Sequence, residues 1–393
     1  MTLPLEGVRV VEYAQYVAGP LCGVLLADLG ADVVKVEPPG GDGYRHVMPV
    51  ASGVGRYFVP LNRGKRSVVV DLKTSEGLES SSRLLRRADI LLHNFNRERA
   101  ARFRLGWETV HEAHAALVVG RLSSFGETGP LADAPAYDLV AQARAGLLTA
   151  HASRGDDVPV RAGGIPMADL TAGFLLATGV LAALLRARET GEGELVDVSL
   201  LAAAFAVQLQ DLVWLDGEAT GARPTDRAEL AARADEIAGG VAMNPYYRCF
   251  ETADGFVAVA CLNLTQRRAL LELFGLDDPT IEAPDVAPVD ESVLAVKQDL
   301  TSAIARAFEE QPTGAWLERL ESAGVPCARV QQREGMLADP QVVAERLVGR
   351  VTQPGLGEID LLAPFVRAGG TRPAPRAAPA LGADTEAVLA ELA

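Results

Sequence analysis

Residues 7–37, GVRVVEYAQYVAGPLCGVLLADLGADVVKVE, contain the pattern that decides the fold. The apolar run over 7–13 predicts a buried strand, and the apolar stretch 21–29 predicts a helix that ends at Gly30. The run 32–37 predicts a second strand. A strand, a turn, a helix and a strand in this order are the outline of a doubly wound, Rossmann-like α/β fold. The turn lacks the G-x-G-x-x-G fingerprint, which disfavours NAD or FAD as a ligand.

The same alternation continues beyond this unit, with strands predicted over 67–72, 89–94 and 116–123. In open α/β sheets, ligands bind beyond the carboxyl ends of the strands. That edge is predicted to carry residues from four strands, namely Gln15, Glu37, Leu72, Asn94 and Phe95.

Residues 163–173, GGIPMADLTAG, lead into a long apolar helix that ends in arginines and Gly191. The pattern predicts a helix with its cap at Asp169. The positive field at a helix start favours the ionised carboxylate, which is the form that can attack an electrophile. An isolated aspartate at this place is far more often a plain helix cap than a nucleophile, so the rest of the chain has to distinguish the two roles.

Composition excludes several classes of protein. The 393 residues carry a formal net charge of −15, and no basic stripe is present, so nucleic acid is not an expected partner. The four cysteines show no C-x-x-C spacing, which predicts neither a metal site nor disulfides and favours a cytoplasmic location. The N-terminus does not match a signal peptide, and no uninterrupted apolar run reaches membrane-spanning length, so no membrane is expected.

The second half of the chain predicts a smaller α+β unit. A helix is predicted over 199–217, followed by a polar linker over 218–238. Asp254-Gly255 predicts a hairpin within 247–262. Further elements of this unit are helices over 264–274 and 291–310 and a strand over 324–330, and the tail 354–382 shows little pattern.

Several motifs together resemble one family. They are residues 5–12 (LEGVRVVE), 26–37 (LADLGADVVKVE), 62–67 (NRGKRS), Asn94-Phe95, 124–130 (SFGETGP), Asp169, and Gly191-x-Gly-x-x-x-Asp197-Val-Ser199. On the basis of these motifs, the chain resembles the family III coenzyme A transferases from about residue 4 to residue 365. This group includes formyl-CoA transferase, carnitine CoA transferase and α-methylacyl-CoA racemase.

The resemblance implies a domain layout. A large CoA-binding domain would span 1–200, linker helices 201–238 and a small α+β domain 239–330. The segment 331–393 would return to the large domain. Two such chains would interlock as a homodimer.

The resemblance also implies a mechanism. Asp169 would attack the thioester of an acyl-CoA, giving a mixed anhydride and then an aspartyl-CoA thioester, from which a small carboxylic acid takes the CoA. Gln15 and the backbone of Gly239 and Gly240 would stabilise the oxyanion. No metal and no tightly bound cofactor are implied, because CoA is a substrate. The implied CoA contacts are Gln15, Tyr16, Ala18, Leu72, Asn94, Phe95, Arg102, Tyr137 and Leu200.

Two alternatives stay open. The racemase branch carries a histidine where this chain has Tyr137, and tyrosine, with an ordinary pKa of about 10, is a poor base at neutral pH. CoA transfer is therefore preferred over racemisation. A catalytically inactive CoA-binding protein is the third hypothesis, and the intact Asp169 motif argues against it.

Overall fold

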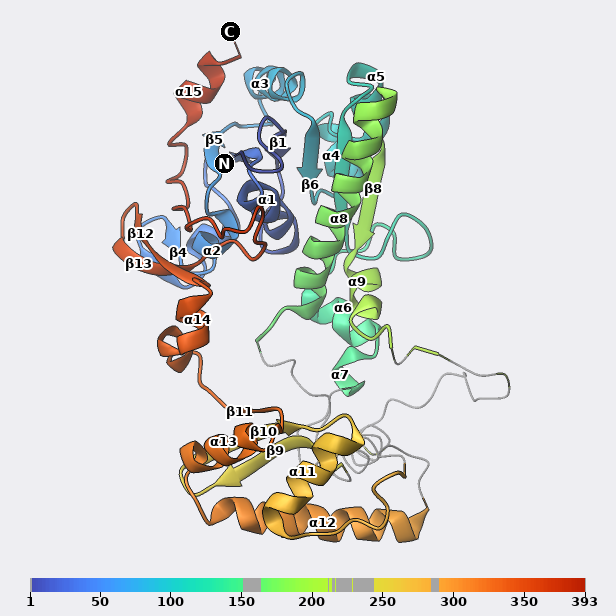
Figure 1. The fold of residues 1–393 in the computed structure, drawn as a ribbon. Helices are drawn as coiled ribbons and strands as arrows, with labels where there is room; N and C mark the ends of the chain where they lie inside the picture. Colours follow the sequence, from blue (N-terminus) through green and yellow to red (C-terminus); the bar gives the residue numbers. More distant parts are fainter. Residues whose placement is uncertain are drawn as a thin grey trace. The chain divides into compact units, whose positions relative to one another are not determined.

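The computed structural model describes residues 2–150, 164–210, 244–283 and 290–392, together with positions 212, 213, 216 and 228. The chain divides into two units (Figure 1). The larger unit comprises 1–147, 164–219 and 339–393, and the smaller comprises 148–163 and 220–338. Most of the predicted linker 201–238, and the predicted turn at Gly239 and Gly240, lie outside the described residues.

A six-stranded parallel sheet forms the centre of the larger unit, in the order β5-β2-β1-β6-β7-β8. The chain adds strands outward from β1 to β5 and then from β6 to β8, so the winding reverses between β1 and β6. The predicted parallel α/β sheet is confirmed. Its strands are β1 (Arg9–Glu12), β2 (Asp32–Glu37), β5 (Arg66–Val69), β6 (Ile90–His93), β7 (Val118–Ser123) and β8 (Leu195–Ser199).

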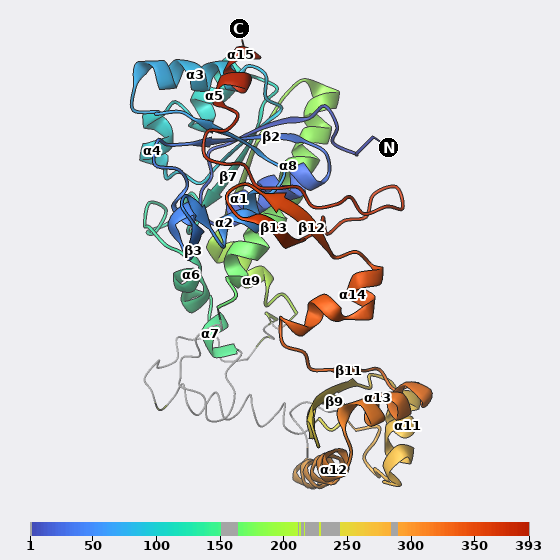
Figure 2. The same cartoon turned by 90° about the vertical axis from the view of Figure 1, so that its left-hand side faces the viewer.

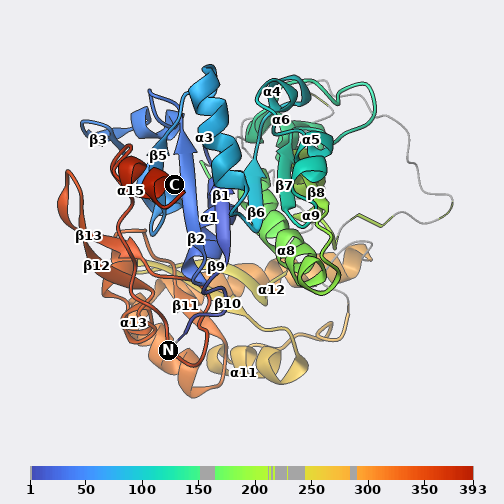
Figure 3. The ribbon, with the colours of Figure 1, turned by 90° about the horizontal axis from the view of Figure 1, so that it is seen from above.

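Helices cover both faces of this sheet, and Figure 3 shows α3 and α8 on opposite sides of it. Both faces of the central strands are therefore buried, which explains their continuous apolar sequences. The first face packs against α1 (Ala18–Asp28), α6 (Asp138–Arg144), α8 (Met167–Thr190) and α9 (Leu200–Ala206). The second face packs against α3 (Ser75–Leu85), α4 (Arg97–Arg102), α5 (Trp107–Ala113) and α15 (Thr385–Ala390).

Helix α8 differs from its prediction at one end. It ends at Gly191, whose φ of 78° is left-handed, as the sequence predicts. The predicted cap at Asp169 is wrong: Pro166 takes the capping position, and Asp169 is the third residue of the helix. By length and composition alone α8 could cross a membrane. It nevertheless packs against α1 and β7 and completely buries Ala172, Leu176 and Val180.

The C-terminal segment packs on the larger unit (Figure 2). The tail, predicted to have little pattern, contributes strand β13 to a hairpin whose Leu361 packs with Phe58 of α2. Further on, the Asp384 carboxylate accepts a hydrogen bond from the Ser67 N–H at 2.8 Å. The remaining elements are η1 (Gly43–His46), β3 (Pro49–Ala51), β4 (Val54–Gly55), α2 (Phe58–Asn62), α7 (Leu147–Ala150), α14 (Pro340–Ala344), β12 (Val348–Gln353) and β13 (Gly357–Leu362).

The smaller unit is an antiparallel sheet, β11-β10-β9, with an aromatic core of Phe250, Phe308 and Trp316. The predicted hairpin and its two following helices are present, and a further helix, α13, was not predicted. The elements of the smaller unit are β9 (Tyr247–Thr252), β10 (Gly255–Ala260), α11 (Leu264–Phe274), α12 (Glu291–Glu309), α13 (Thr313–Ser322), β11 (Cys327–Arg329) and η2 (Gly335–Ala338).

The helix predicted over 199–217 belongs to the larger unit. It is shorter than predicted, because α9 ends at Ala206.

Candidate active site

The loops that follow β1 and β6 are joined by a pair of hydrogen bonds between Gln15 and Asn94. The Asn94 side-chain amide donates to the Gln15 carbonyl at 2.9 Å, and the Gln15 N–H donates to Asn94 Oδ1 at 3.2 Å. This pair lies where the winding of the sheet reverses, the place at which doubly wound folds bind their ligands. The structure thus brings these two predicted residues together at the expected edge.

Tyr16 has a strained backbone at this edge. Its φ is +72°, a left-handed conformation that costs a residue with a side chain about 1–2 kcal/mol. Its ring packs edge-on against Tyr44, with centroids 5.6 Å apart, and against Tyr137, at 6.0 Å. Burial, and then Tyr137 and Asp42, raise the pKa of Tyr16, which keeps the phenol neutral. Tyr16 therefore offers an aromatic wall rather than a base.

A cavity of about 400 Å³ opens beside these loops. Asp169 lines it, from the first turn of α8. Most of the predicted CoA contacts line the same cavity, namely Gln15, Tyr16, Ala18, Asn94, Phe95, Tyr137 and Leu200. The candidate nucleophile and these seven residues thus share one space, although they come from five separate parts of the sequence.

The half-buried Asp169 carboxyl group has an unusual environment. Burial, and secondly the negative charge of Asp138, raise its pKa to about 7. Asp138 is close because its Oδ1 accepts a hydrogen bond from the Asp169 N–H at 3.1 Å. Burial and the neighbouring charge therefore outweigh the helix field that was expected to favour ionisation. A pKa near neutrality lets the group be both a competent nucleophile and a good leaving group.

Two predicted contacts lie elsewhere. Leu72 lines a separate small cavity of about 60 Å³, and Arg102 lines neither cavity. Arg99, one turn earlier on α4, lines both. Its guanidinium lies 4.9 Å from the centre of the Phe95 ring, and among the described residues no carboxylate pairs with it. Arg99 is thus better placed than Arg102 to meet an anionic ligand.

Comparison with known proteins identifies the family. The sequence model described as CoA-transferase family III matches residues 5–385. The chain belongs to this family. The earlier resemblance is thereby confirmed, and the protein is a family III CoA transferase.

Its relatives include two enzymes whose names state the acids on which they act. Succinate–glutarate CoA-transferase from Agrobacterium fabrum is 34% identical over 99% of this chain and 96% of that protein. Succinyl-CoA:mesaconate CoA-transferase from Haloarcula marismortui is 33% identical over 89% of this chain and 86% of its own length. The crystal structure of a CAIB/BAIF family protein from Brucella suis superposes with a TM-score of 0.80, at 27% identity and full coverage of both chains.

Sequence reasoning missed two neighbouring residues of this family III CoA transferase, Arg121 and His93, which are register partners on adjacent strands. Arg121 lines the cavity, but its charge is taken up by Asp197 on the next strand, at 2.7 Å, and by Glu127. His93, the neighbour of Arg121 on β6, is fully buried and stacked on Phe95, and burial lowers its pKa to about 3. It is therefore a neutral packing residue. Both residues could have been found from the sequence, because each lies near the carboxyl end of a predicted strand.

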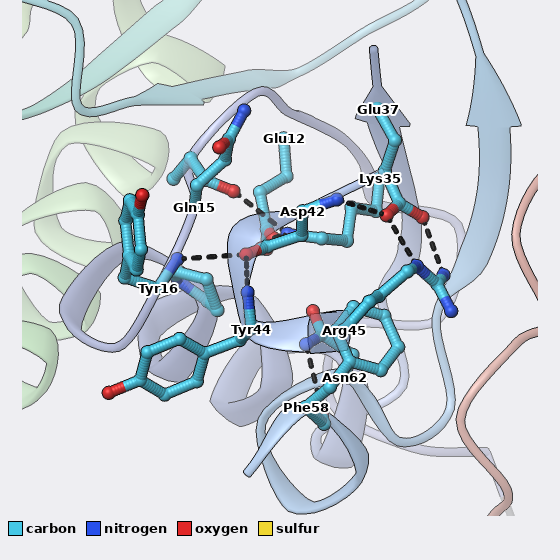
Figure 4. A network of polar contacts seen from close by, with 12 residues as sticks. Glu12, Gln15, Tyr16, Lys35, Glu37, Asp42, Tyr44, Arg45, Phe58 and Asn62 are labelled. Atoms are coloured by element: carbon cyan, nitrogen blue, oxygen red, sulfur yellow. Dashed lines mark hydrogen bonds and ion pairs between the residues drawn. The ribbon is translucent and has the colours of Figure 1, made fainter. Parts of the chain in front are cut away.

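A second feature that the sequence did not predict lies beneath the Gln15-Tyr16 turn. Figure 4 shows a network of buried charged side chains in which Lys35 contacts both Glu12 and Asp42. Asp42 in turn accepts a hydrogen bond from the Tyr16 N–H at 3.3 Å.

Within the part of the chain that the structure describes, no cluster of His, Cys, Asp or Glu side chains is arranged to hold a metal ion.

We expect Asp138→Asn to move the acid limb of the pH–kcat/KM profile to lower pH. Asparagine keeps an oxygen that can accept from the Asp169 N–H, but it removes the like charge that helps to raise the pKa of Asp169. The activity that depends on the ionised form is lost as pH falls through the pKa of Asp169, about 7, so a lower pKa extends activity to more acidic pH.

The matched control for this experiment is Asp133→Asn, which removes an exposed carboxylate that lines the same cavity. Its acid limb should stay in place. An unchanged limb in Asp138→Asn would show that Asp138 does not influence the ionisation of Asp169.

Proposed function

We propose that this enzyme transfers CoA between two carboxylic acids, with Asp169 as the nucleophile. The observation that carries the proposal is the position of Asp169. Its half-buried carboxyl group lines the cavity at the sheet's reversal point and has a pKa near neutrality. A covalent intermediate splits one difficult exchange between two acids into easier steps.

The reaction proceeds by exchange of acyl bonds. An Asp169 carboxylate oxygen attacks the thioester carbon of the donor acyl-CoA, and the C–S bond breaks to leave a mixed anhydride and CoA thiolate. The thiolate attacks the Asp169 carbonyl carbon, which releases the donor acid and forms an aspartyl-CoA thioester. The acceptor carboxylate repeats these steps in reverse order, so that acceptor acyl-CoA and free Asp169 result without net transfer of protons or electrons.

Oxyanions form at the acyl carbon in each step. We propose that the Gln15 side chain stabilises them from its place in the cavity wall. The Gly239-Gly240 backbone remains the second proposed donor and lies outside the described residues.

We propose succinyl-CoA as donor and a small dicarboxylic acid as acceptor. The names of the relatives support this, because they specify succinate with glutarate and succinyl-CoA with mesaconate. The Arg99 guanidinium in the cavity wall adds a positive charge suited to anionic substrates. The test is to mix purified enzyme with succinyl-CoA and a panel of mono- and dicarboxylic acids and to detect new thioesters by mass. Transfer to none of these acids would contradict the proposal.

The racemase alternative is disfavoured by the cavity itself. Among the described residues that line it there is no histidine, and Tyr137 is exposed at the start of α6. Incubation of a 2-methylacyl-CoA in D2O separates the two activities. A transferase leaves the α-proton in place, whereas α-deuteration without CoA transfer would establish the racemase.

Chemical trapping distinguishes a CoA transferase from an inactive CoA-binding protein. With an acyl-CoA and hydroxylamine, the Asp169 anhydride or aspartyl-CoA thioester should be captured as a hydroxamate that peptide mass spectrometry locates at residue 169. A protein that only binds CoA would give no such adduct.

We expect Arg99→Ala to raise KM for succinyl-CoA and Arg102→Ala to leave it unchanged. Both residues are arginines of α4, but only Arg99 lines the cavities. A charge-assisted hydrogen bond contributes about 1.5–3 kcal/mol, so KM should rise roughly tenfold to a hundredfold. Steady-state kinetics of the two variants checks this. A raised KM in Arg102→Ala alone would restore the role that the resemblance implies for that residue.

We also propose that two chains form the homodimer implied by the resemblance, with the cytoplasm as its location. Native mass spectrometry of the purified enzyme tests the first point, because a monomer at catalytic concentrations would contradict it.

A further inference from the structure

Six acidic and basic side chains lie buried together next to the Gln15-Tyr16 turn, and Figure 4 labels five of them. Each of the six is at most 5% exposed. Three are acidic and three are basic, so their charges balance: Glu12, Glu37 and Asp42 against Lys35, Lys65 and Arg45.

The strands build this cluster directly. Glu12 and Lys35 are register partners on β1 and β2, and their side chains are 3.0 Å apart. Lys65 approaches the other Glu12 oxygen to 2.8 Å. Arg45 donates two hydrogen bonds of 2.7 Å to Glu37. Removing such ions from water costs several kcal/mol per ion, and well-packed apolar residues often serve stability equally well. Stability alone therefore does not explain the cluster.

The cluster contacts the backbone of the turn on both sides of Gln15. Lys35 Nζ donates to the Ala14 carbonyl at 2.8 Å, and the Tyr16 N–H donates to Asp42 Oδ1 at 3.3 Å. The other Asp42 oxygen lies 2.9 Å from Lys35 Nζ. Asn94 holds the backbone of Gln15 itself. All three residues of the turn are thus held by side chains that are largely or fully buried.

We propose that Asp42 is a positioning residue for CoA transfer: held by Lys35, its carboxylate fixes Tyr16 in the left-handed conformation that keeps Gln15 and Tyr16 in the cavity wall. This inference rests on the proposed function. Asp42 lines neither cavity, so it acts through the turn and not on the substrate.

The strain at Tyr16 gives the proposal its physical basis. A non-glycine residue at φ +72° persists only where its surroundings hold it. Without the acceptor at Asp42, the turn can relax toward an ordinary conformation and move Gln15. A displacement of about 1 Å at a reacting centre can cost about a hundredfold in rate.

The first experiment compares Asp42→Ala with Asp42→Asn. Alanine removes the acceptor for the Tyr16 N–H, so kcat should fall about tenfold to a hundredfold, with a smaller change in KM. Asparagine keeps one oxygen acceptor and should recover part of kcat. Asp28→Ala is the control, because it breaks another buried ion pair, with Arg63, at the far end of α1. It should lower stability without the selective loss of kcat. Wild-type kcat in Asp42→Ala would overturn the proposal.

The second experiment is a double-mutant cycle with Tyr16→Gly. Glycine adopts φ +72° without strain, so the further effect of Asp42→Ala should shrink several-fold in the Tyr16→Gly background. Equal fold losses in both backgrounds would show that Asp42 does not act through Tyr16. If Asp42→Ala fails to fold, the same cycle is run with Asp42→Asn.

A third measurement does not depend on activity. Amide hydrogen exchange, read by mass spectrometry, should accelerate about tenfold or more in the peptide covering residues 13–17 of Asp42→Ala, since the Tyr16 N–H loses its acceptor. Exchange in β7 should be unchanged. If the wild-type enzyme shows no CoA transfer, the proposed function fails while this measurement still decides whether Asp42 holds the turn. Unchanged exchange at 13–17 would refute the positioning role alone.

Discussion

Asp169→Asn and Asp169→Ala should both abolish CoA transfer, lowering kcat by about 10⁴-fold or more, because each removes the only proposed nucleophile. Binding of acyl-CoA should remain, since Asp169 is one of many cavity residues. Thioester formation followed by mass spectrometry measures the first effect, and calorimetric titration with a non-reactive CoA thioether measures the second.

A second readout tests whether the Asp169 carboxyl group has a raised pKa in the folded protein. Burial raises the pKa of Asp169 to about 7, above its value of about 3.9 in an unfolded chain. Its protonated form therefore fits the folded protein better, and the stability it contributes is lost as pH rises from about 4 to 7. Asp169→Asn should raise the melting temperature at about pH 8 and leave it nearly unchanged at about pH 4.

Asp133→Asn again serves as the control in the same cavity, with turnover expected close to that of the wild type. Retained transfer in Asp169→Ala would remove this residue from the mechanism. A melting temperature that responds equally at both pH values would show that Asp169 is ionised in the folded state like an ordinary aspartate.

Gly23→Ala should destabilise the larger unit by several kcal/mol, although alanine normally favours a helix by about 1 kcal/mol over glycine. Gly23 lies inside α1, and a Cβ there would be 1.8 Å from Glu12 Oε2. That oxygen cannot easily move, because Lys65 holds it at 2.8 Å and Glu12 is fully buried. Disrupting a buried ion pair costs about 3–5 kcal/mol, which exceeds the gain in helix propensity.

Gly314→Ala is the matched control, since Gly314 also lies in a helix and its nearest neighbour to a new Cβ is 3.9 Å away. It should be neutral or slightly stabilising. Urea unfolding followed by circular dichroism compares the two variants. A Gly23→Ala protein as stable as wild type would mean that Glu12 can shift at no cost, which would weaken the case for a rigid charge cluster.

The sheet could be predicted because its strands are continuous apolar runs separated by helical patterns, and parallel strands buried on both faces have this sequence. Gln15, Asn94 and Phe95 followed from the same argument, since each lies at the end of a predicted strand or within two residues after it. The start of α8 could not be placed from the pattern, because aspartate is favoured both at the cap and in the first turn of a helix.

The charge cluster could not be predicted for a different reason. Lys35 and Lys65 would each be taken for solvated residues when viewed alone, and only the register of β1 with β2 and the approach of the Lys65 loop bring them to Glu12. Arg99 and Arg102 pose a similar problem. They are one turn apart on a short helix, and only the direction of that helix decides which one reaches the cavity.

The outer strand β5 has a consequence for synthesis of the chain on the ribosome. Backbone amides of this strand donate to Asp384 and to the Thr385 hydroxyl, more than 300 positions later in the sequence. While translation is under way, that row of donors stays open to pairing with other nascent chains. We therefore expect premature termination before residue 384 to yield a product that aggregates in the cell, even though every proposed active-site residue has already been synthesised.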